Sequence, residues 1–346
     1  MNKLCLWIVR DALYTSESVS DIVRFAHENK YKHLFVQVRG RGDAYYNSNI
    51  VVKNKNISDT SYDPLADIID KAHAVGIQIH AWVNVYLLWT APNIPTNRTH
   101  LMHTKPGWID SQFKSNQIDI SNNSIVYLAP HNSSVNTYLL NVFREILINY
   151  DVDGLHLDYL RYADENYGNN ADAIKEYIKN DRQNPKYFYT NKDKGLQSNV
   201  SDWNQFKIDS ISDLVKSIKM MMTHINPDFI LSAAVKPNLA EAKSRYFQDW
   251  EFWLMNDYLD WVVLMNYAAE FSLFANNVDY VRKNFGEIYK SRIIIGLGIY
   301  NQSVDDFSQK VTYTYSSDIN NLSIFSYNYL INNLQHWNSI TNQLDH

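Results

Sequence analysis

The chain has 346 residues, a formal net charge of −5 and a single cysteine, Cys5. An acidic balance without a Lys/Arg-rich run argues against the usual basic surface for nucleic acid, and one cysteine excludes an intrachain disulfide framework. The apolar runs are too short to span a bilayer, and the start of the chain does not have the pattern of a secretory signal peptide, so we expect no membrane span.

Eight short apolar runs recur along the chain, and the segments between them have helical or loop-like patterns. Strands that are buried on both faces and separated by helices form parallel sheets, and eight such units close most simply into a (β/α)8 barrel. We therefore predict an α/β TIM barrel that forms a single domain over residues 1–346. The predicted strands are residues 4–9, 33–38, 77–83, 152–157, 229–235, 261–265, 292–297 and 322–327.

The segment 62–76 illustrates the helices that we expect between strands. Asp63 is a candidate N-cap, Pro64 suits the first helical turn, and Gly76 can end the helix. Amphipathic patterns indicate further helices, one before the fourth run and one that ends before Pro227. Two long insertions are expected over the mouth of the barrel, at residues 85–131 and 162–202.

Polar residues share one parity within the predicted strands. In the fourth run, His156 and Asp158 alternate with Leu155 and Leu157. Alternate residues point to opposite faces, and active sites of this fold lie at the carboxyl ends of the strands. We therefore expect Asp158 at the mouth and His156 one layer deeper, as an orienting or hydrogen-bonding residue. The other residues expected in the same pocket are Gln37, Arg39, Asn84, Lys236, Asn266 and Tyr267.

Four segments, in the same order, resemble the glycoside-hydrolase-like family ten, a group of bacterial TIM-barrel proteins related to glycoside hydrolases. They are FVQVRGRGDAYYNS (35–48), YDPLADIIDKAHAVGIQIHAWVN (62–84), YDVDGLHLDYLRY (150–162) and YFQDWEFWLMNDYLDWVVLMNY (246–267). The resemblance implies a glycosidase that acts on a bacterial cell-wall or related polysaccharide, and it implies export.

The chain departs from the family pattern at two places. The usual Asn-Pro-Tyr-Arg after the third strand is Asn84-Val85-Tyr86-Leu87, and the frequent second aspartate after Asp158 is Tyr159. Chitinase-type barrels are a weaker comparison, because the position of their catalytic glutamate is Leu160 here. A chitinase-like mechanism with its acid at that position is therefore excluded.

Asp158 and Glu270 are the predicted catalytic pair, because most glycosidases flank the scissile bond with two carboxyl groups. Glu270 follows the sixth strand and would donate the proton, although an ordinary solvated loop acid is the alternative reading. Cations near Asp158 would hold it ionised. The residues expected to bind substrate are Gln37, Arg39, Asn84, His156, Arg161, Lys236, Asn266, Tyr267 and Trp89.

Two other functions fit the sequence. A metal-dependent hydrolase could use His80, His156 and Asp158 as ligands, but the clustered spacing of a zinc motif is absent, so we expect no metal and no cofactor. A non-catalytic barrel could hold glycans through loop aromatics such as Trp89 and Trp108. The expected partner in either glycan reading is an oligosaccharide or polysaccharide, and the oligomeric state is not set by the sequence.

Overall fold

The computed structural model describes residues 3–113, 125–179, 182–187 and 197–340. Eight parallel strands form a closed barrel, and they confirm the predicted runs with bounds that shift by two residues at most. The order around the barrel is β1, β2, β3, β6, β7, β8, β9 and β10, and β10 pairs back with β1. The strands are β1 (Leu4–Ile8), β2 (His33–Arg39), β3 (Gln78–Asn84), β6 (Gly154–Asp158), β7 (Ile230–Val235), β8 (Trp261–Met265), β9 (Ile293–Gly298) and β10 (Leu322–Phe325).

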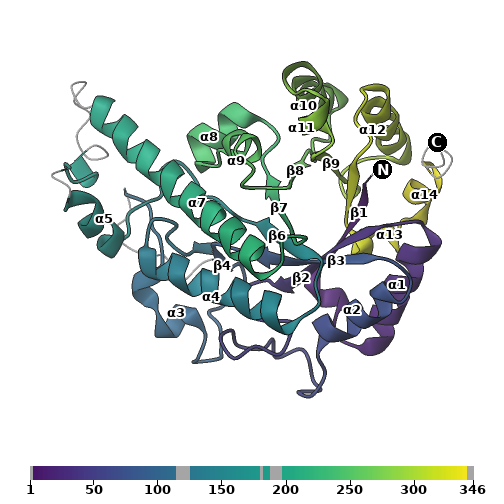
Figure 1. Cartoon of the computed structure of the whole chain (residues 1–346), viewed down its shortest axis with the longest axis horizontal. Coiled ribbons are helices and arrows are strands. Elements are labelled where there is room, and N and C mark those ends of the chain that lie inside the picture. Colours follow the sequence, from purple (N-terminus) through teal and green to yellow (C-terminus); the bar gives the residue numbers. More distant parts are fainter. Residues whose placement is uncertain (1–2, 114–124, 180–181, 188–196, 341–346) are drawn as a thin grey trace.

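Helices cover the outside of the barrel (Figure 1), and α4 packs against the long helix α7. Within the described ranges, no helix is both long and apolar enough to cross a bilayer. The main helices of the outer layer are α1 (Ser16–Glu28), α2 (Pro64–His73), α4 (Ser133–Asn149), α7 (Gln197–Ile225), α8 (Leu239–Tyr246), α9 (Trp250–Met255), α10 (Phe271–Asn284) and α12 (Val304–Ser316). Shorter helices follow at α11 (Glu287–Lys290), α13 (Tyr327–Leu330) and α14 (Leu334–Asn338).

Helix α2 forms as its sequence predicts. Asp63 is the N-cap, and its carboxylate accepts hydrogen bonds from the backbone N–H groups of Leu65 and Ala66, both at 3.2 Å. Pro64 is the first helical residue, where its missing N–H costs nothing. Gly76, just beyond the helix, has a φ of 73°, a conformation that favours glycine. The chain can therefore turn directly from α2 into β3.

Aromatic and polar side chains from the inward parity fill the barrel. His156 stacks on Phe35 with 4.0 Å between ring centroids, and Trp7 meets it edge-on at 4.5 Å. Its Nδ1 is hydrogen-bonded to Ser232 Oγ at 2.8 Å. Burial lowers the pKa of His156 and of His80 well below the usual range, so both imidazoles are neutral. The barrel is a packed core beneath its mouth.

The described parts of both insertions lie outside the barrel sheet. In the first, β4 (Leu87–Trp89) pairs antiparallel with β5 (Val126–Tyr127), and α3 (Leu101–Thr104) follows β4. The second contains α5 (Ala171–Ile178). The first insertion is anchored at the mouth, because the Val85 N–H donates to the Asp158 carbonyl at 2.8 Å. Outside the described residues lie 114–124 of the first insertion and 180–181 and 188–196 of the second.

Candidate active site

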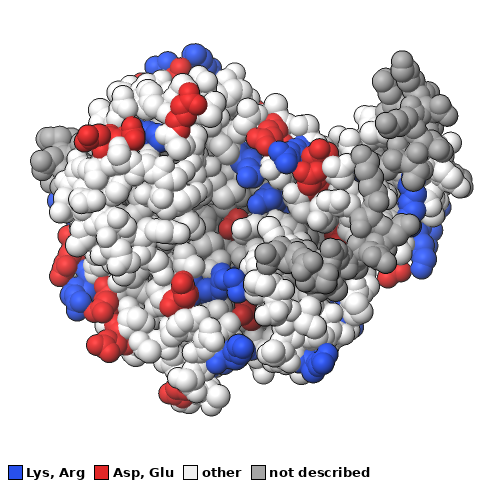
Figure 2. All heavy atoms as spheres, turned by 180° about the vertical axis from the view of Figure 1, so that it is seen from behind, with Lys and Arg blue, Asp and Glu red and all other residues white. Residues whose placement is uncertain are grey.

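A cavity of about 420 Å³ opens at the carboxyl ends of the barrel strands. Its walls come from strands on opposite sides of the barrel, as the parity of the sequence predicts. Figure 2 shows one face of the molecule with a hollow near its centre and Lys and Arg side chains round it. The aromatic and apolar part of the lining is Trp7, Val9, Trp82, Leu87, Met265, Tyr267, Tyr300 and Phe325. The polar part is Arg10, Gln37, Arg41, Asn84, Thr90, Asp158, Tyr159, Arg161 and Lys236.

Asp158 is the one carboxyl group among the described residues that line this cavity. Its side chain is at the end of β6, and the residue is only 6 % exposed. Burial raises the pKa of Asp158 to about 6, although Arg161 and the Tyr159 N–H, which donates to Oδ1 at 2.6 Å, favour the ionised form. A pKa near 6 allows this carboxyl group to exchange a proton close to neutral pH.

Two cations stand beside Asp158 on the same side of the cavity. The Arg161 guanidinium lies 4.8 Å from the centre of the Tyr159 ring and 5.1 Å from that of Tyr246. The Lys236 ammonium lies 5.0 Å from the Tyr246 ring. Burial lowers the pKa of Lys236, with Arg161 acting in the same direction. Both cations therefore lie against the ring of Tyr246, and both line the cavity.

Gln248 fixes the strand ends that carry Asp158 and Lys236, and no sequence pattern predicted it. The residue is fully buried. Its Nε2 donates to the carbonyls of Leu160 at 3.2 Å and Ala234 at 3.3 Å, and its Oε1 accepts from the Lys236 N–H at 2.8 Å. The available signal was a lone amide in the otherwise aromatic stretch YFQDW. Gln248 is a positioning residue for this wall.

A chain of hydrogen bonds forms the neighbouring wall, where Asn84 of β3 pairs with Asp158 of β6. Arg10 Nη1 donates to Gln37 Oε1 at 2.8 Å, Gln37 Nε2 donates to Asn84 Oδ1 at 3.3 Å, and Asn84 Nδ2 donates to the Gly40 carbonyl at 2.9 Å. Gln37 and Asn84 therefore lie at the mouth, where the sequence places them. Arg10 was not predicted, although it directly follows the first predicted strand (4–9), just as Lys236 directly follows the fifth (229–235).

The structure corrects the expected place of Arg39. The register between β2 and β3 shifts between Gln37 and Arg39, so that Gln37 pairs with Trp82 but Arg39 pairs with Val83. This bulge turns Arg39 off the inward parity. Its Nη1 donates to the Asn84 carbonyl, and the side chain is fully buried outside the cavity lining.

Several other expected site residues also lie away from the cavity. Asn266 faces α10, where its Nδ2 donates to the Phe274 carbonyl at 3.0 Å, because it continues the outward parity of Leu264, whereas Tyr267 continues the inward parity of Met265. Glu270 is exposed, is the N-cap residue of α10 and accepts a hydrogen bond from Ser272 Oγ at 2.7 Å. His156 lies in the core below the lining, and Trp89 lines a different cavity.

Tyr267 is at the mouth as expected. Its ring lies 5.5 Å from that of Phe325, and its buried hydroxyl has no hydrogen-bond partner among the described residues. Burial raises the pKa of Tyr267 well above the usual range, and the nearby Asp158 acts in the same direction. The hydroxyl therefore keeps its proton near neutral pH.

The site contains no assembled metal centre in the part of the chain that the structure describes. No group of three or more His, Cys, Asp or Glu side chains lies close enough there to hold a metal ion. His80 and His156, two of the three ligands considered from sequence, are instead neutral core residues, and His80 Nε2 is hydrogen-bonded to His33 Nδ1 at 3.2 Å.

Comparisons with known proteins match the resemblance found in the sequence. A family model described as Glycosyl hydrolase-like 10 matches residues 7–317. The Glycosyl hydrolase YngK of Bacillus subtilis (strain 168) is 24% identical over 202 residues, which are 56% of this chain and 34% of that protein. The Glycosyl hydrolase DigH of Escherichia coli (strain K12) is 25% identical over 288 residues, or 77% of this chain and 62% of that protein. The chain thus spans less than two thirds of either relative.

A solved structure shows the same fold over the whole chain. The PgaB (BpsB) glycoside hydrolase domain from Bordetella bronchiseptica superposes with a TM-score of 0.76 at 12% identity, and the match covers 99% of both chains. At this identity the likeness concerns the fold alone. It confirms the predicted TIM barrel.

Proposed function

The chain belongs to the Glycosyl hydrolase-like 10 family, and we propose that it hydrolyses an acidic polysaccharide of the bacterial cell wall, or a related glycan, with Asp158 as proton donor. The observation that carries the proposal is Asp158, the one carboxyl group in the described lining of the barrel mouth, which is buried and shares that lining with four cations. Because such polysaccharides lie outside the cytoplasmic membrane, the proposal includes export.

Asp158 suits the role of general acid. Cleavage of a glycosidic bond needs a proton on the leaving oxygen, and a carboxyl group with a raised pKa retains that proton near neutral pH. Burial raises the pKa of Asp158 to about 6. The proton would pass from Asp158 to the oxygen as the bond to the anomeric carbon breaks.

The second group in the reaction comes from the substrate in this proposal. Glu270 is exposed, and the described lining offers no carboxyl group besides Asp158. Some glycosidases work without a second carboxyl group because a group of the substrate assists. The oxygen of a 2-acetamido group would attack the anomeric carbon and form a cyclic intermediate. Water would then open the cyclic intermediate and return a proton to Asp158.

The charge of the cavity indicates an acidic glycan. Arg10, Arg41, Arg161 and Lys236 line it, against Asp158 alone, although the whole chain has a net charge of −5. Like charges held together in a concave site raise the local concentration of ligands of opposite charge. Carboxylates on the sugars would pair with these cations. A neutral glycan would leave them unpaired on binding.

The test is product analysis by mass spectrometry with two forms of one glycan, peptide-free peptidoglycan strands before and after reduction of their carboxyl groups to alcohols. We expect cleavage of the acidic form and a kcat/KM about tenfold lower for the reduced form, since charge-assisted hydrogen bonds are lost. The variant Lys236→Gln should reduce the ratio of kcat/KM between the acidic and the reduced glycan, because it removes one of the lining cations. Equal rates on both forms would contradict the acidic substrate class.

The pH dependence of kcat/KM tests the role of Asp158. A general acid must be protonated in the free enzyme, so activity should be level below about pH 6 and fall about tenfold per pH unit above it. The direction follows from the raised pKa of Asp158. If Asp158 acted in its ionised form, the pH profile of kcat/KM would have the opposite slope, and activity would be lost as the pH falls below about 6. That outcome would assign Asp158 as nucleophile or base.

A second candidate function is a glycan-binding barrel without catalysis. The observation in its favour is the same single carboxyl group, because most glycosidases need two. The two functions differ in one measurement. Binding of the glycan by calorimetry with no product after prolonged incubation would favour the binding barrel, whereas product release that depends on Asp158 favours the enzyme.

A further inference from the structure

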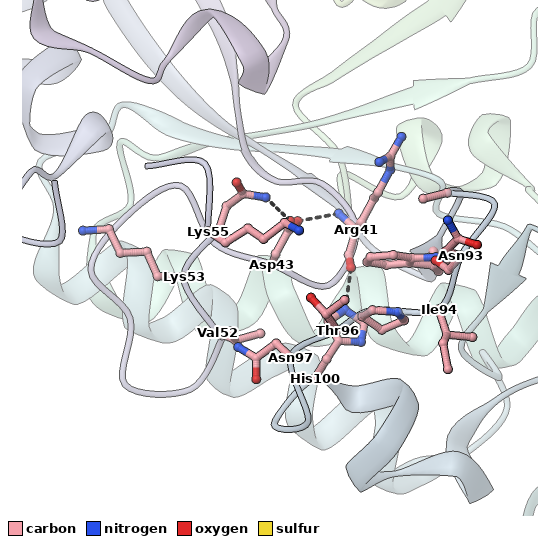
Figure 3. A pocket seen from close by; sticks show the side chains of 14 residues that line it. Arg41, Asp43, Val52, Lys53, Lys55, Asn93, Ile94, Thr96, Asn97 and His100 are labelled. Carbon is pink, nitrogen blue, oxygen red and sulfur yellow. Dashed lines mark hydrogen bonds between the residues drawn. The ribbon is translucent and has the colours of Figure 1, made fainter. Parts of the chain in front are cut away.

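A second cavity, of about 330 Å³, lies between the segment that joins β2 to α2 and the first insertion. Figure 3 shows it between two loops, with Lys53 and Lys55 on one side and Asn93 and Ile94 on the other. Trp89, at the end of β4, also lines it, and the indole is half-buried. Glycosidase chemistry at Asp158 does not use this cavity.

The two cavities share a wall. Arg41 lines both of them. In the segment that follows β3, Leu87 and Thr90 line the mouth of the barrel, whereas Trp89 and Ala91 line the second cavity. Arg41 Nε donates to Thr90 Oγ1 at 2.7 Å, which closes the wall between them. A linear polymer that leaves the mouth across Arg41 and Thr90 would therefore reach the second cavity.

Hydrogen bonds hold the second cavity in shape. Trp89 Nε1 donates to the Asn93 carbonyl at 2.8 Å, and the His100 ring meets the indole edge-on with 5.2 Å between centroids. His100 Nε2 is bonded to the Arg41 carbonyl at 2.7 Å, and the Arg41 N–H donates to Asp43 Oδ1 at 2.8 Å (Figure 3). Trp89 is thus fixed, so a ligand would not have to order its side chain.

The lining combines an aromatic face with a few polar groups, which is the usual composition of a small-molecule site. An indole presents a flat apolar surface that matches the C–H face of a sugar ring, and such contacts tolerate different sugars. Around it, Asn54 and Asn97 contribute amides, and Lys55 contributes an exposed ammonium. These groups suit the hydroxyls and acidic substituents of a sugar.

We propose that the second cavity is a distal subsite that holds a sugar unit of the same glycan, stacked on Trp89, while Asp158 acts on a bond at the barrel mouth. This inference rests on the proposed function. It assigns to the 87–91 segment a role in selecting long chains over short ones, because a short substrate fills only the mouth.

The test compares peptide-free peptidoglycan disaccharides, tetrasaccharides and octasaccharides with the variant Trp89→Ala. We expect KM for the octasaccharide to rise about tenfold with kcat nearly unchanged, since stacking contributes equally to the ground and transition states. Rates on the shortest fragment that is cleaved should change less than twofold. Trp89→Phe should retain most of the affinity. Phe252→Ala, which removes an exposed aromatic ring of α9 outside both cavities, is the matched control.

A second variant tests the subsite without removing the hydrogen bond between Trp89 and Asn93, whose loss in Trp89→Ala could change the loop. Ala91→Phe leaves Trp89 in place and fills the cavity, so it should raise KM for the octasaccharide in the same way. Equal effects on short and long fragments, or no effect of either variant, would overturn the subsite. If the wild-type protein cleaves none of the fragments, the proposed function fails, and calorimetric binding of the octasaccharide to wild-type and Trp89→Ala proteins still tests the subsite.

Discussion

The variant Asp158→Asn should lose a factor of about 10²–10⁴ in kcat on a glycan substrate, which is the usual contribution of a general acid. Asparagine preserves the size of the side chain and can still accept the 2.6 Å hydrogen bond from the Tyr159 N–H, but it has no proton to give to the leaving oxygen. KM should change little, because the lost interaction belongs to the transition state. Initial rates with the peptide-free peptidoglycan fragment that the wild-type protein cleaves fastest provide the measurement.

Two controls make this result specific. Glu270→Gln should retain nearly full activity, because Glu270 is exposed and bonded to Ser272 away from the cavity. A glycoside with an acidic leaving group, such as a nitrophenyl glycoside, should be cleaved by Asp158→Asn with a much smaller loss, since such a group hardly needs a proton. Near-normal turnover of the natural glycan by Asp158→Asn, or a large loss in Glu270→Gln, would reverse the assignment of the acid.

The sequence predicts the barrel well because the signal is repeated. Each strand is a short apolar run buried on both faces, and each is followed by a helix or loop pattern, so an error in one run does not change the fold. Alternation then locates the inward residues within the strands. Asp158, Gln37 and Asn84 are found at the mouth for this reason, and His156 is found in the layer below.

Predictions fail where parity is broken or was not applied. The bulge between Gln37 and Arg39 depends on pairing with β3, which a single strand's sequence does not encode, and it turns Arg39 out of the site. Asn266 follows β8 on the outward parity of Leu264, and Glu270 lies at the N-cap of α10, so neither side chain reaches the mouth. Proximity to a strand end in sequence is therefore weaker evidence than parity within the strand.

Two residues of the site, Gln248 and Arg10, were not predicted from the sequence. Gln248 acts through hydrogen bonds to the backbone, and Arg10 acts from a short segment after β1. Gln248 lies on no strand, yet its amide binds Leu160, Ala234 and Lys236 and so joins the ends of β6 and β7. A lone buried amide gives no periodic signal. Arg10 sits one residue beyond a predicted strand and reaches back to Gln37. Its side-chain direction depends on the short helix η1 (Arg10–Ala12), which the apolar pattern does not reveal.

The thermal stability of Asp158→Asn should exceed that of the wild-type protein at about pH 8 and match it at about pH 4. In the folded protein, burial raises the pKa of Asp158 to about 6, whereas an aspartate in an unfolded chain titrates near 4. Below the lower pKa the carboxyl group is protonated in both states and costs nothing. As the pH rises through 6, the folded wild-type protein must hold a buried charge, and a difference of about two pKa units corresponds to about 3 kcal/mol at most.

Asparagine removes that charge, so the stability difference between variant and wild-type should grow across the window from about pH 4 to about pH 6 and then level off. The matched control is Asp279→Asn on α10. A hydrogen bond from the Tyr313 hydroxyl, at 2.8 Å, lowers the pKa of Asp279, so its charged form stabilises the fold and its replacement should destabilise the protein at pH 8. Unfolding midpoints measured by circular dichroism at the two pH values give both signs. A loss of stability in Asp158→Asn at pH 8 would mean that the cations at the mouth already compensate the buried charge, and the pKa of Asp158 would then lie below its usual value, where it cannot serve as the acid.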